Sequence, residues 1–190
     1  NPGTVTVEGT QRTTGMQFAS DGYLLTAGVA GKLELVDGSA GYAAIRVDAG
    51  KTATLNVDLS GNATLAKLDA GTLALNGNNS YTGGTTIAAG TLQLGDGGAS
   101  GAIVGNVANN GVLAFNRSDV VTFAGQISGS GVVNQIGSGT TILTADNTYT
   151  GSTTISAGTL QLGNGGTSGA ILGNVDNNGA LTFNRSDVQT

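Results

Sequence analysis

The sequence predicts an all-β protein, a parallel β-solenoid of about nine coils of roughly 20 residues each. A long segment, Tyr81 to Thr122, recurs without gaps as Tyr149 to Thr190, with 33 of 42 positions identical. Short stretches that alternate apolar with small or polar residues also begin at a glycine once in about every 20 residues. A short repeat without helical periodicity is typical of a solenoid, in which each coil stacks on the one before.

The alternating stretches are the predicted strands. The clearest begin at Gly31, Gly71, Gly90, Gly111, Gly158 and Gly179, and weaker ones begin at Gly50, Gly131 and Gly139. From Gly31 to Gly131 the starts are nearly evenly spaced; a short step of eight then leads to Gly139, after which the regular spacing resumes. Because the second and fourth residues after each clear glycine are apolar, one side of each strand is expected to be buried. These expected core residues are Leu33, Leu35, Leu73, Leu75, Leu92, Leu94, Leu113, Phe115, Leu160, Leu162, Leu181 and Phe183.

The turns between the strands contain repeated Asn-Asn-Gly segments at 109–111 and 177–179. In a solenoid they are expected to supply positive φ angles at the corners, with leucine stacked over leucine in successive coils. The same Asn-Gly pairs are typical of β-hairpins, which leaves an antiparallel sandwich as the alternative fold.

The composition excludes several kinds of site. The chain has 190 residues, 34 of them glycine, with no cysteine, no histidine and a net charge of −5. Disulfides, thiolate metal sites and histidine-dependent catalysis are therefore excluded. No basic patch is present, so nucleic-acid binding is not expected. No apolar run approaches the roughly 18 residues of a membrane-spanning helix.

A family resemblance rests on the repeated motif itself. The segments Asn79 to Gly95 and Asn147 to Gly163 resemble the strand repeat of bacterial autotransporter passenger domains, with its YTGGTTIxAGTLxLG pattern. Gly15 to Gly28 is similar to the coil that often precedes such repeats. The resemblance implies a right-handed parallel β-helix that is exported by a Gram-negative bacterium through type V secretion. It also implies a longer parent protein, held at the outer membrane only through a carboxy-terminal β-barrel translocator that this sequence lacks.

The expected organisation is a single β-helix over residues 1–190, a fragment of a longer passenger domain. Residues 1–76 are expected to form less regular coils, and residues 77–190 to form the strand repeats with a 68-residue period. The first residue is not methionine, and the second copy ends at Thr190 where the first continues into FAGQISGSG. We therefore expect both ends to be cuts in a longer chain, with the second copy truncated.

Few residues suggest chemistry, and no catalytic, cofactor-binding or metal-binding residue is predicted. Asp48 and Asp69 occur in similar contexts about one coil length apart, as either a carboxylate pair or two solvated turn residues near Lys51 and Lys67. The Gly-rich segments 95–101 and 163–169 are interpreted as corners rather than as Ca²⁺ sites, and scattered Thr pairs leave an ice-binding face as a further alternative. The repeated NRSD segments are expected to lie on one edge of the rod, with Arg117 and Asp119 paired locally, as a candidate surface-binding edge. Its residues are Asn116, Arg117, Asp119, Asn184, Arg185 and Asp187.

The function expected from these observations is structural. We expect a non-enzymatic β-helical stalk at the bacterial cell surface, extracellular or secreted, that supports adhesion or self-association. A host-cell surface receptor or glycan is the expected partner, and no cofactor is expected. The alternative is a polysaccharide-degrading β-helix enzyme that uses carboxylates from adjacent coils. A third alternative is that the repeats mainly drive export by folding coil upon coil.

Overall fold

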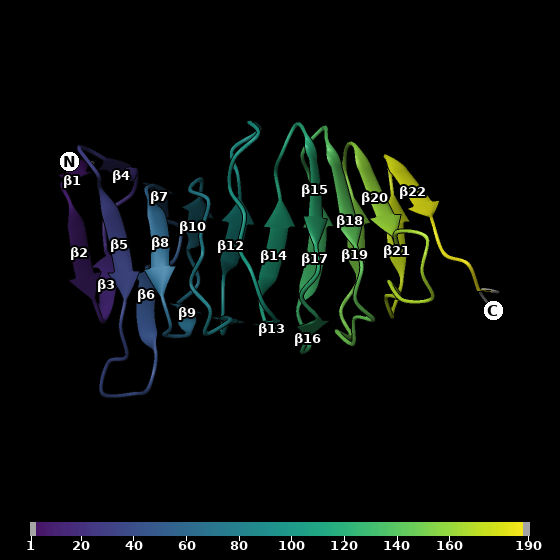
Figure 1. Cartoon of the computed structure of the whole chain (residues 1–190), viewed down its shortest axis with the longest axis horizontal. Coiled ribbons are helices and arrows are strands. Elements are labelled where there is room, and N and C mark those ends of the chain that lie inside the picture. Colours follow the sequence, from purple (N-terminus) through teal and green to yellow (C-terminus); the bar gives the residue numbers. More distant parts are fainter. Residues whose placement is uncertain (1–2, 188–190) are drawn as a thin grey trace.

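The chain winds through three sides of a rod in a fixed order, and the coils stack from the N-terminal to the C-terminal end (Figure 1). A computed structural model describes residues 3–187, and every element in that range is a β-strand. We call the three sides face 1, face 2 and face 3, in the order in which each coil visits them.

Face 1 is a single nine-stranded sheet that runs the whole length of the stack. Its strands are β1 (Thr4–Val7), β4 (Tyr23–Ala27), β7 (Thr52–Asn56), β10 (Thr72–Leu75), β12 (Thr91–Leu94), β14 (Val112–Phe115), β17 (Val132–Gln135), β19 (Thr153–Ile155) and β21 (Val175–Asn177). One strand in each coil gives nine coils, as predicted.

Face 2 carries two shorter sheets. The first contains β2 (Thr10–Thr13), β5 (Lys32–Leu35) and β8 (Asp58–Gly61), and the second contains β15 (Val120–Phe123), β18 (Thr140–Leu143), β20 (Thr159–Leu162) and β22 (Ala180–Phe183). Between them the stacking continues through backbone contacts, because Ser80 N–H donates to Leu59 O (2.8 Å) and Asn78 forms a parallel bridge with Ala102.

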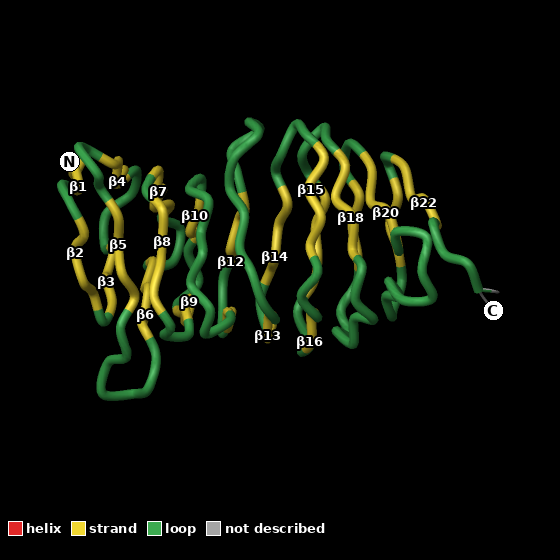
Figure 2. Tube along the Cα trace, viewed as in Figure 1, coloured by secondary structure: helices red, strands yellow, loops and turns green. Residues whose placement is uncertain are grey.

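Face 3 is a six-stranded sheet. It contains β3 (Gly15–Phe18), β6 (Ala43–Val47), β9 (Leu65–Leu68), β11 (Thr85–Ile87), β13 (Val107–Asn109) and β16 (Ile127–Ser128). Figure 2 shows that the strands are short and that loops make up much of each coil; the segment between β5 and β6 extends furthest from the stack.

The core lies along the axis of the rod. β10, β12 and β14 pair in parallel so that Leu73, Leu92 and Leu113 form one column, and all three are fully buried. Every second side chain of a strand points inward, so the apolar side chains are buried in the core. The backbone N–H and C=O groups form hydrogen bonds with the coils above and below, so the polar groups of the backbone are satisfied as well. The fold is thus the predicted parallel β-solenoid. The antiparallel sandwich is wrong, because every strand pair within the described residues is parallel.

The corners differ from the prediction in one respect. Gly111 and Gly179 do not adopt the left-handed conformation expected of them; Asn109 Oδ1 instead accepts the backbone N–H of Gly111 (3.1 Å), an Asx turn. Glycine is required at 111 by close packing, because a Cβ there would lie 2.5 Å from Gly90 O. Positive φ occurs at Gly90 itself (68°), where the preceding corner turns.

The two repeat copies do not occupy equivalent faces. β9, β11 and β13 lie on face 3, whereas their counterparts in the second copy, β17, β19 and β21, lie on face 1. β10, β12 and β14 lie on face 1, and their counterparts β18, β20 and β22 lie on face 2. One repeat unit therefore makes three coils plus one face, and the second copy is turned by one face about the rod axis.

This rotation explains the short step between Gly131 and Gly139. Gly131 precedes β17 on face 1, and Gly139 precedes β18 on face 2 of the same coil. Likewise Gly31 precedes β5 on face 2, whereas Gly50 precedes β7 on face 1. The alternating stretches thus form columns on two different faces.

Candidate functional site

The two NRSD segments lie at different corners of the rod. Asn116 follows β14 on face 1, and Asn184 follows β22 on face 2. They do not share one edge, as the sequence led us to expect, because the second copy is turned by one face.

Arg117 fixes a corner of the solenoid. Its side chain is only 9% exposed; Nε donates to Asp119 Oδ1 (2.9 Å), and Nη2 donates to Asp119 Oδ2 (2.7 Å), a two-pronged ion pair. Nη2 also donates to the carbonyl oxygen of Ala99 (2.7 Å) in the Gly-rich segment of the previous coil. The hydrogen bond from the guanidinium lowers the pKa of Asp119. The predicted local pairing of Arg117 with Asp119 is confirmed.

The partner of Arg117 is a closed loop, the segment 95–101. Gly97 N–H donates to Asn116 O (2.8 Å), and Ser118 N–H donates to Gly98 O (2.9 Å), so the loop pairs with the NRSD segment like a short strand. The ends of the loop meet: a Cβ on Gly101, whose φ is 92°, would lie 2.2 Å from Gly95 N. The loop therefore forms a corner of the solenoid, and the NRSD segment of the next coil holds it in place.

We call this arrangement, in which the arginine of an NRSD segment binds the aspartate of its own turn and the Gly-rich loop of the previous coil, the clamp. The second copy repeats it. Arg185 donates to both carboxylate oxygens of Asp187 (2.9 and 2.7 Å) and to the carbonyl oxygen of Thr167. Gly165 N–H donates to Asn184 O (2.7 Å), as Gly97 does in the first copy. Arg185 Nη1 also lies 3.5 Å from Asp146 Oδ1.

The copies differ at one contact. Asn78 stands in the first copy where Asp146 stands in the second. Arg117 Nη1 and Arg185 Nη1 are both buried without a hydrogen-bond acceptor among residues 3–187, but only Arg185 Nη1 has a carboxylate, that of Asp146, within ion-pair distance. The arginines of both segments are therefore engaged with their own turns and with the loops of the previous coil, and the side chains that these corners expose include Asp96, Ser118, Asn184, Ser186 and Asp187.

The two aspartates considered for catalysis have separate partners. Asp69 Oδ1 lies 3.1 Å from Arg46 Nη1, and Asp48 Oδ1 accepts a hydrogen bond from Gln17 Nε2 (3.3 Å). Each carboxylate thus pairs with the coil before it. Within residues 3–187 no group of three or more acidic side chains is arranged to hold a metal ion.

Lys67 is the polar residue that sequence reasoning misplaced. The sequence suggested a position beside the solvated aspartates, but its side chain points into the core and is fully buried. Its Nζ donates to the carbonyl oxygens of Leu68 (2.8 Å), Asp69 (2.8 Å) and Ala89 (3.2 Å), which joins the corners of two coils. Burial lowers the pKa of Lys67 to about 8, an effect that the nearby Asp69 charge partly opposes. Its alternation with the buried Leu65 was the available signal.

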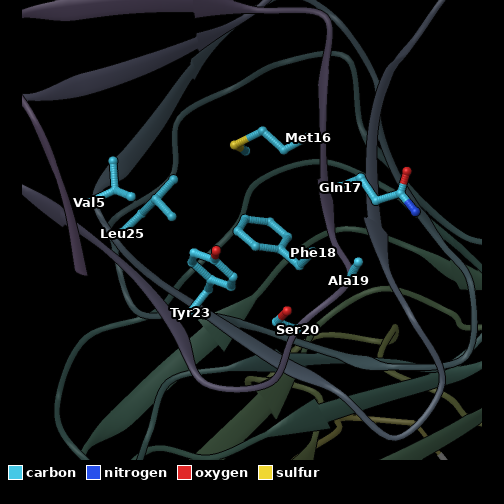
Figure 3. A pocket seen from close by; sticks show the side chains of 8 residues that line it. All are labelled: Val5, Met16, Gln17, Phe18, Ala19, Ser20, Tyr23 and Leu25. Carbon is cyan, nitrogen blue, oxygen red and sulfur yellow. The ribbon is translucent and has the colours of Figure 1, made fainter. Parts of the chain in front are cut away.

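The two ends of the stack carry apolar hollows. One, of about 480 Å³, lies at the first coils, and Figure 3 shows the aromatic rings of Phe18 and Tyr23 beside Met16 and Leu25. The other, of about 350 Å³, lies among residues of the last coils, including Leu162, Leu181 and Phe183. Both hollows adjoin buried core residues, Phe18 and Leu25 at the first and Leu162 at the second. Phe183, which was expected to be buried, is 61% exposed, because its strand β22 is the last of its sheet and no described strand stacks on its outer side. No helix within the described range is long and apolar enough to cross a membrane.

Comparison with known proteins gives consistent results. The family model described as "Passenger-associated-transport-repeat" matches residues 65–94 and 133–162, two segments related by the same repeat offset. The chain is 42% identical over 215 aligned residues to the "Adhesin BmaC autotransporter" of Brucella suis biovar 1 (strain 1330). That alignment covers 97% of this chain and 6% of the length of the relative. No solved structure matches the chain.

Proposed function

This chain is an autotransporter passenger segment with passenger-associated transport repeats, and on that premise we propose that it acts as a β-helical stalk that supports adhesion or self-association at the bacterial cell surface. The observation that carries this proposal is the nine-stranded sheet of face 1, which runs through every coil. A continuous ladder of backbone hydrogen bonds with a continuous core makes a stiff rod that holds other parts of a protein at a distance.

The relative gives the stalk its context. It is named as an adhesin, and this chain spans about 6% of its length. We propose that the segment contributes to binding of a host-cell receptor or glycan as spacer and scaffold, with the loops 95–101 and 163–169 and their NRSD clamps as the surface to examine. Autotransporter passengers are extracellular, which places the segment outside the cell.

The proposed role is non-enzymatic. Asp48 and Asp69, the carboxylates considered for glycoside hydrolysis, each pair with a basic or amide side chain, whereas a catalytic pair needs both carboxyl groups directed at one substrate. Neither residue lines either of the two hollows described above.

The test is removal of one repeat unit from the protein on the cell that exports it. Deletion of residues 65–132 joins Thr64 to Val133, so that β17 takes the place of its counterpart β9. The coils on the two sides of the deletion can then stack directly on each other. Surface display, host-cell binding and cell clumping are then measured. We expect display to persist and binding or clumping to fall, because the rod becomes shorter by three coils and one face.

Two other results would count against the proposal. Loss of display with normal binding per displayed molecule would assign the repeats to export. Unchanged display, binding and clumping would leave this segment without a part in adhesion. An assay of glycan cleavage by the purified chain and its Asp48→Asn and Asp69→Asn variants completes the test, because variant-sensitive turnover would establish an enzyme.

A further inference from the structure

Asparagine followed directly by glycine is a chemically labile pair, because glycine has no side chain to keep its backbone nitrogen away from the asparagine amide. The chain contains four such asparagines: Asn76, Asn110, Asn164 and Asn178. Asparagine is also among the residues that limit the lifetime of proteins at high temperature. The structure holds the four amides in different ways, and the differences indicate which of them reacts.

The first two of these asparagines are held by neighbouring coils. Asn76 is 8% exposed, and its Nδ2 donates to Asn56 Oδ1 (2.8 Å) and Asp96 Oδ2 (3.0 Å). Asn110 Oδ1 accepts hydrogen bonds from the backbone N–H (3.1 Å) and the hydroxyl group (3.2 Å) of Ser130 in the next coil. These bonds must break before either amide carbon can turn toward the glycine nitrogen that follows it. Both residues are therefore protected.

Asn164 lies instead in the open part of the loop 163–169, and it is exposed. A Cβ on Gly165, whose φ is 86°, or on Gly166 would meet no atom within 4 Å. The asparagine side chain therefore has room to turn, and water has access to it. The nitrogen that would attack is restrained by the clamp, because Gly165 N–H donates to Asn184 O (2.7 Å).

We propose that Asn164 is a site of spontaneous deamidation and that the Arg185 clamp controls its rate. While the clamp is closed, the N–H group of Gly165 is engaged with Asn184 O and keeps its proton. When the clamp opens, the loop is released from the NRSD segment and the glycine nitrogen is free to attack. The inference concerns the chemistry of the loop and stands whether or not the loop takes part in adhesion.

The reaction needs only water as a co-reactant. The glycine nitrogen forms a bond to the side-chain amide carbon of asparagine, and the side-chain nitrogen leaves as ammonia with the proton of the glycine N–H group. The product is a cyclic succinimide. Water then opens either of its two carbonyl groups, which gives aspartate or isoaspartate. The sum converts an amide and water into a carboxylic acid and ammonia, and nothing is oxidised or reduced.

The two products have different effects on the corner. Aspartate leaves the backbone as it was, and the first copy already carries Asp96 at the same place in its loop. Isoaspartate adds a methylene group to the backbone, which moves Gly165 N–H out of line with Asn184 O. Isoaspartate should therefore keep the clamp open, so that the reaction releases the corner irreversibly.

The experiment is a time course of the purified chain at mildly alkaline pH, followed by peptide mapping with mass spectrometry. Digestion with a protease of broad specificity places the four asparagines in separate peptides. Asn178 is the internal reference, because it is exposed and Gly179 N–H donates to Asn177 Oδ1 (3.1 Å) within the same corner. That contact does not depend on the clamp.

The variant Arg185→Met removes the clamp, because it takes away the donor to the Asp187 carboxylate and to Thr167 O. The control is Arg12→Met, which removes an exposed arginine paired with Glu34 far from the loop. Circular dichroism and urea unfolding establish that each variant is folded. If Arg185→Met does not fold, Asp187→Asn replaces it, because it removes the charge of the ion pair and keeps the arginine.

We expect slow conversion of Asn164 in the unsubstituted chain and a rate about tenfold higher in Arg185→Met, because loss of the clamp raises the population of the open loop. Asn178 should keep its rate, and Asn76 and Asn110 should stay unconverted in both chains. The control variant should match the unsubstituted chain. In concentrated urea all four asparagines should react at similar rates, because the unfolded chain restrains none of them.

Three results would overturn the proposal. The first is no conversion of Asn164 in either chain. The second is a rate at Asn164 that loss of the clamp leaves unchanged. The third is an equal rise at Asn164 and Asn178, which would assign the effect to general unfolding rather than to the clamp.

Discussion

Lys67 and Gln135 occupy the same position in the two repeat copies, and each buried side chain donates hydrogen bonds to carbonyl oxygens of the corner that follows its strand. Lys67 Nζ reaches the oxygens of Leu68, Asp69 and Ala89; Gln135 Nε2 donates to Gly137 O (2.9 Å), and Gln135 Oε1 accepts from Thr141 Oγ1 (2.7 Å). The same corner is thus closed by an ammonium group on face 3 and by an amide on face 1.

This pair predicts the effect of substitutions at Lys67. Lys67→Met leaves the carbonyl oxygens without a donor and should lower the free energy of unfolding by about 1–3 kcal/mol. The stability of Lys67→Gln should lie between those of the unsubstituted chain and Lys67→Met. An amide can reach the corner, but Leu73 stands at the position from which Thr141 donates to Gln135 in the second copy. Urea unfolding at pH 7 measures both. A methionine variant as stable as the unsubstituted chain would show that the buried amine contributes nothing.

The lowered pKa of Lys67 predicts a pH dependence. Between about pH 8 and 10.5 an unfolded lysine keeps its proton while Lys67 in the folded chain has lost it, so the unfolded state binds more protons. The free energy of unfolding therefore rises with pH in this window. Measured at pH 7.5, 8.5 and 9.5, the stability difference between the unsubstituted chain and Lys67→Gln should shift in favour of the unsubstituted chain. A difference that is constant with pH would contradict the assignment.

Two buried tyrosines act in the opposite direction at higher pH. Tyr81 Oη lies 2.7 Å from Thr85 Oγ1, and Tyr149 Oη lies 2.6 Å from Thr153 Oγ1. Burial raises the pKa of both tyrosines, so each keeps its proton in the folded chain where an unfolded tyrosine loses it. Stability should therefore fall as the pH rises above about 10.

Tyr81→Phe tests this arrangement. At pH 7 the variant should be about 1 kcal/mol less stable, because the buried Thr85 hydroxyl loses its partner. Above pH 10 the gap should narrow, because phenylalanine cannot ionise. Tyr42→Phe, in the loop between β5 and β6, serves as the control and should change neither value.

The Arg117 clamp predicts a local and a global effect. Arg117→Met leaves the Asp119 carboxylate and Ala99 O without their donor and should cost about 2–4 kcal/mol, with faster proteolysis within the loop 95–101. Arg12→Met is the matched control: its ion pair with Glu34 is exposed, and its loss should cost less than about 1 kcal/mol. Equal losses in the two variants would show that burial of the clamp is unimportant.

The same clamp predicts a stabilising substitution. Asn78→Asp should supply to Arg117 Nη1 the carboxylate that Asp146 supplies to Arg185 in the second copy. We expect a gain of about 1 kcal/mol in urea unfolding, lost when Arg117 is also replaced by methionine. A gain that survives the loss of Arg117 would rule out this pairing.

The rotation of the repeat predicts which deletions fold. Removal of residues 65–132 takes out one whole repeat unit, so each later strand meets neighbours like those of its counterpart. Removal of residues 65–98 deletes half a unit and brings the loop segment to the place of β9. The first variant should unfold cooperatively with a β-sheet circular dichroism spectrum, and the second should lose cooperativity. Equal behaviour of both would contradict the register described here.

Much of the fold could be read from particular residues. The alternation at Leu73 and Leu75, repeated at Leu92 and Leu94, identified the buried side of the strands, and the spacing of the glycines gave the coil length and the number of coils. The candidate site was only partly predictable. The pairing of Arg117 with Asp119 follows from their closeness in the chain, but the contact to Ala99 depends on a loop in the previous coil, which local pattern does not reveal.

The amino-acid sequence alone specifies a β-solenoid, the length of each coil and the side chains that face the axis, because a two-residue alternation and a repeat of one coil length are properties of the linear chain. The face that each strand occupies depends instead on how the coils stack. Strands on all three faces share the same alternation, so Gly131 and Gly139 look alike although they open strands on different faces. The direction of the chain at each corner, set by backbone turns and by contacts such as those of Lys67 and Arg117 with neighbouring coils, turns the second copy by one face and separates the two NRSD segments.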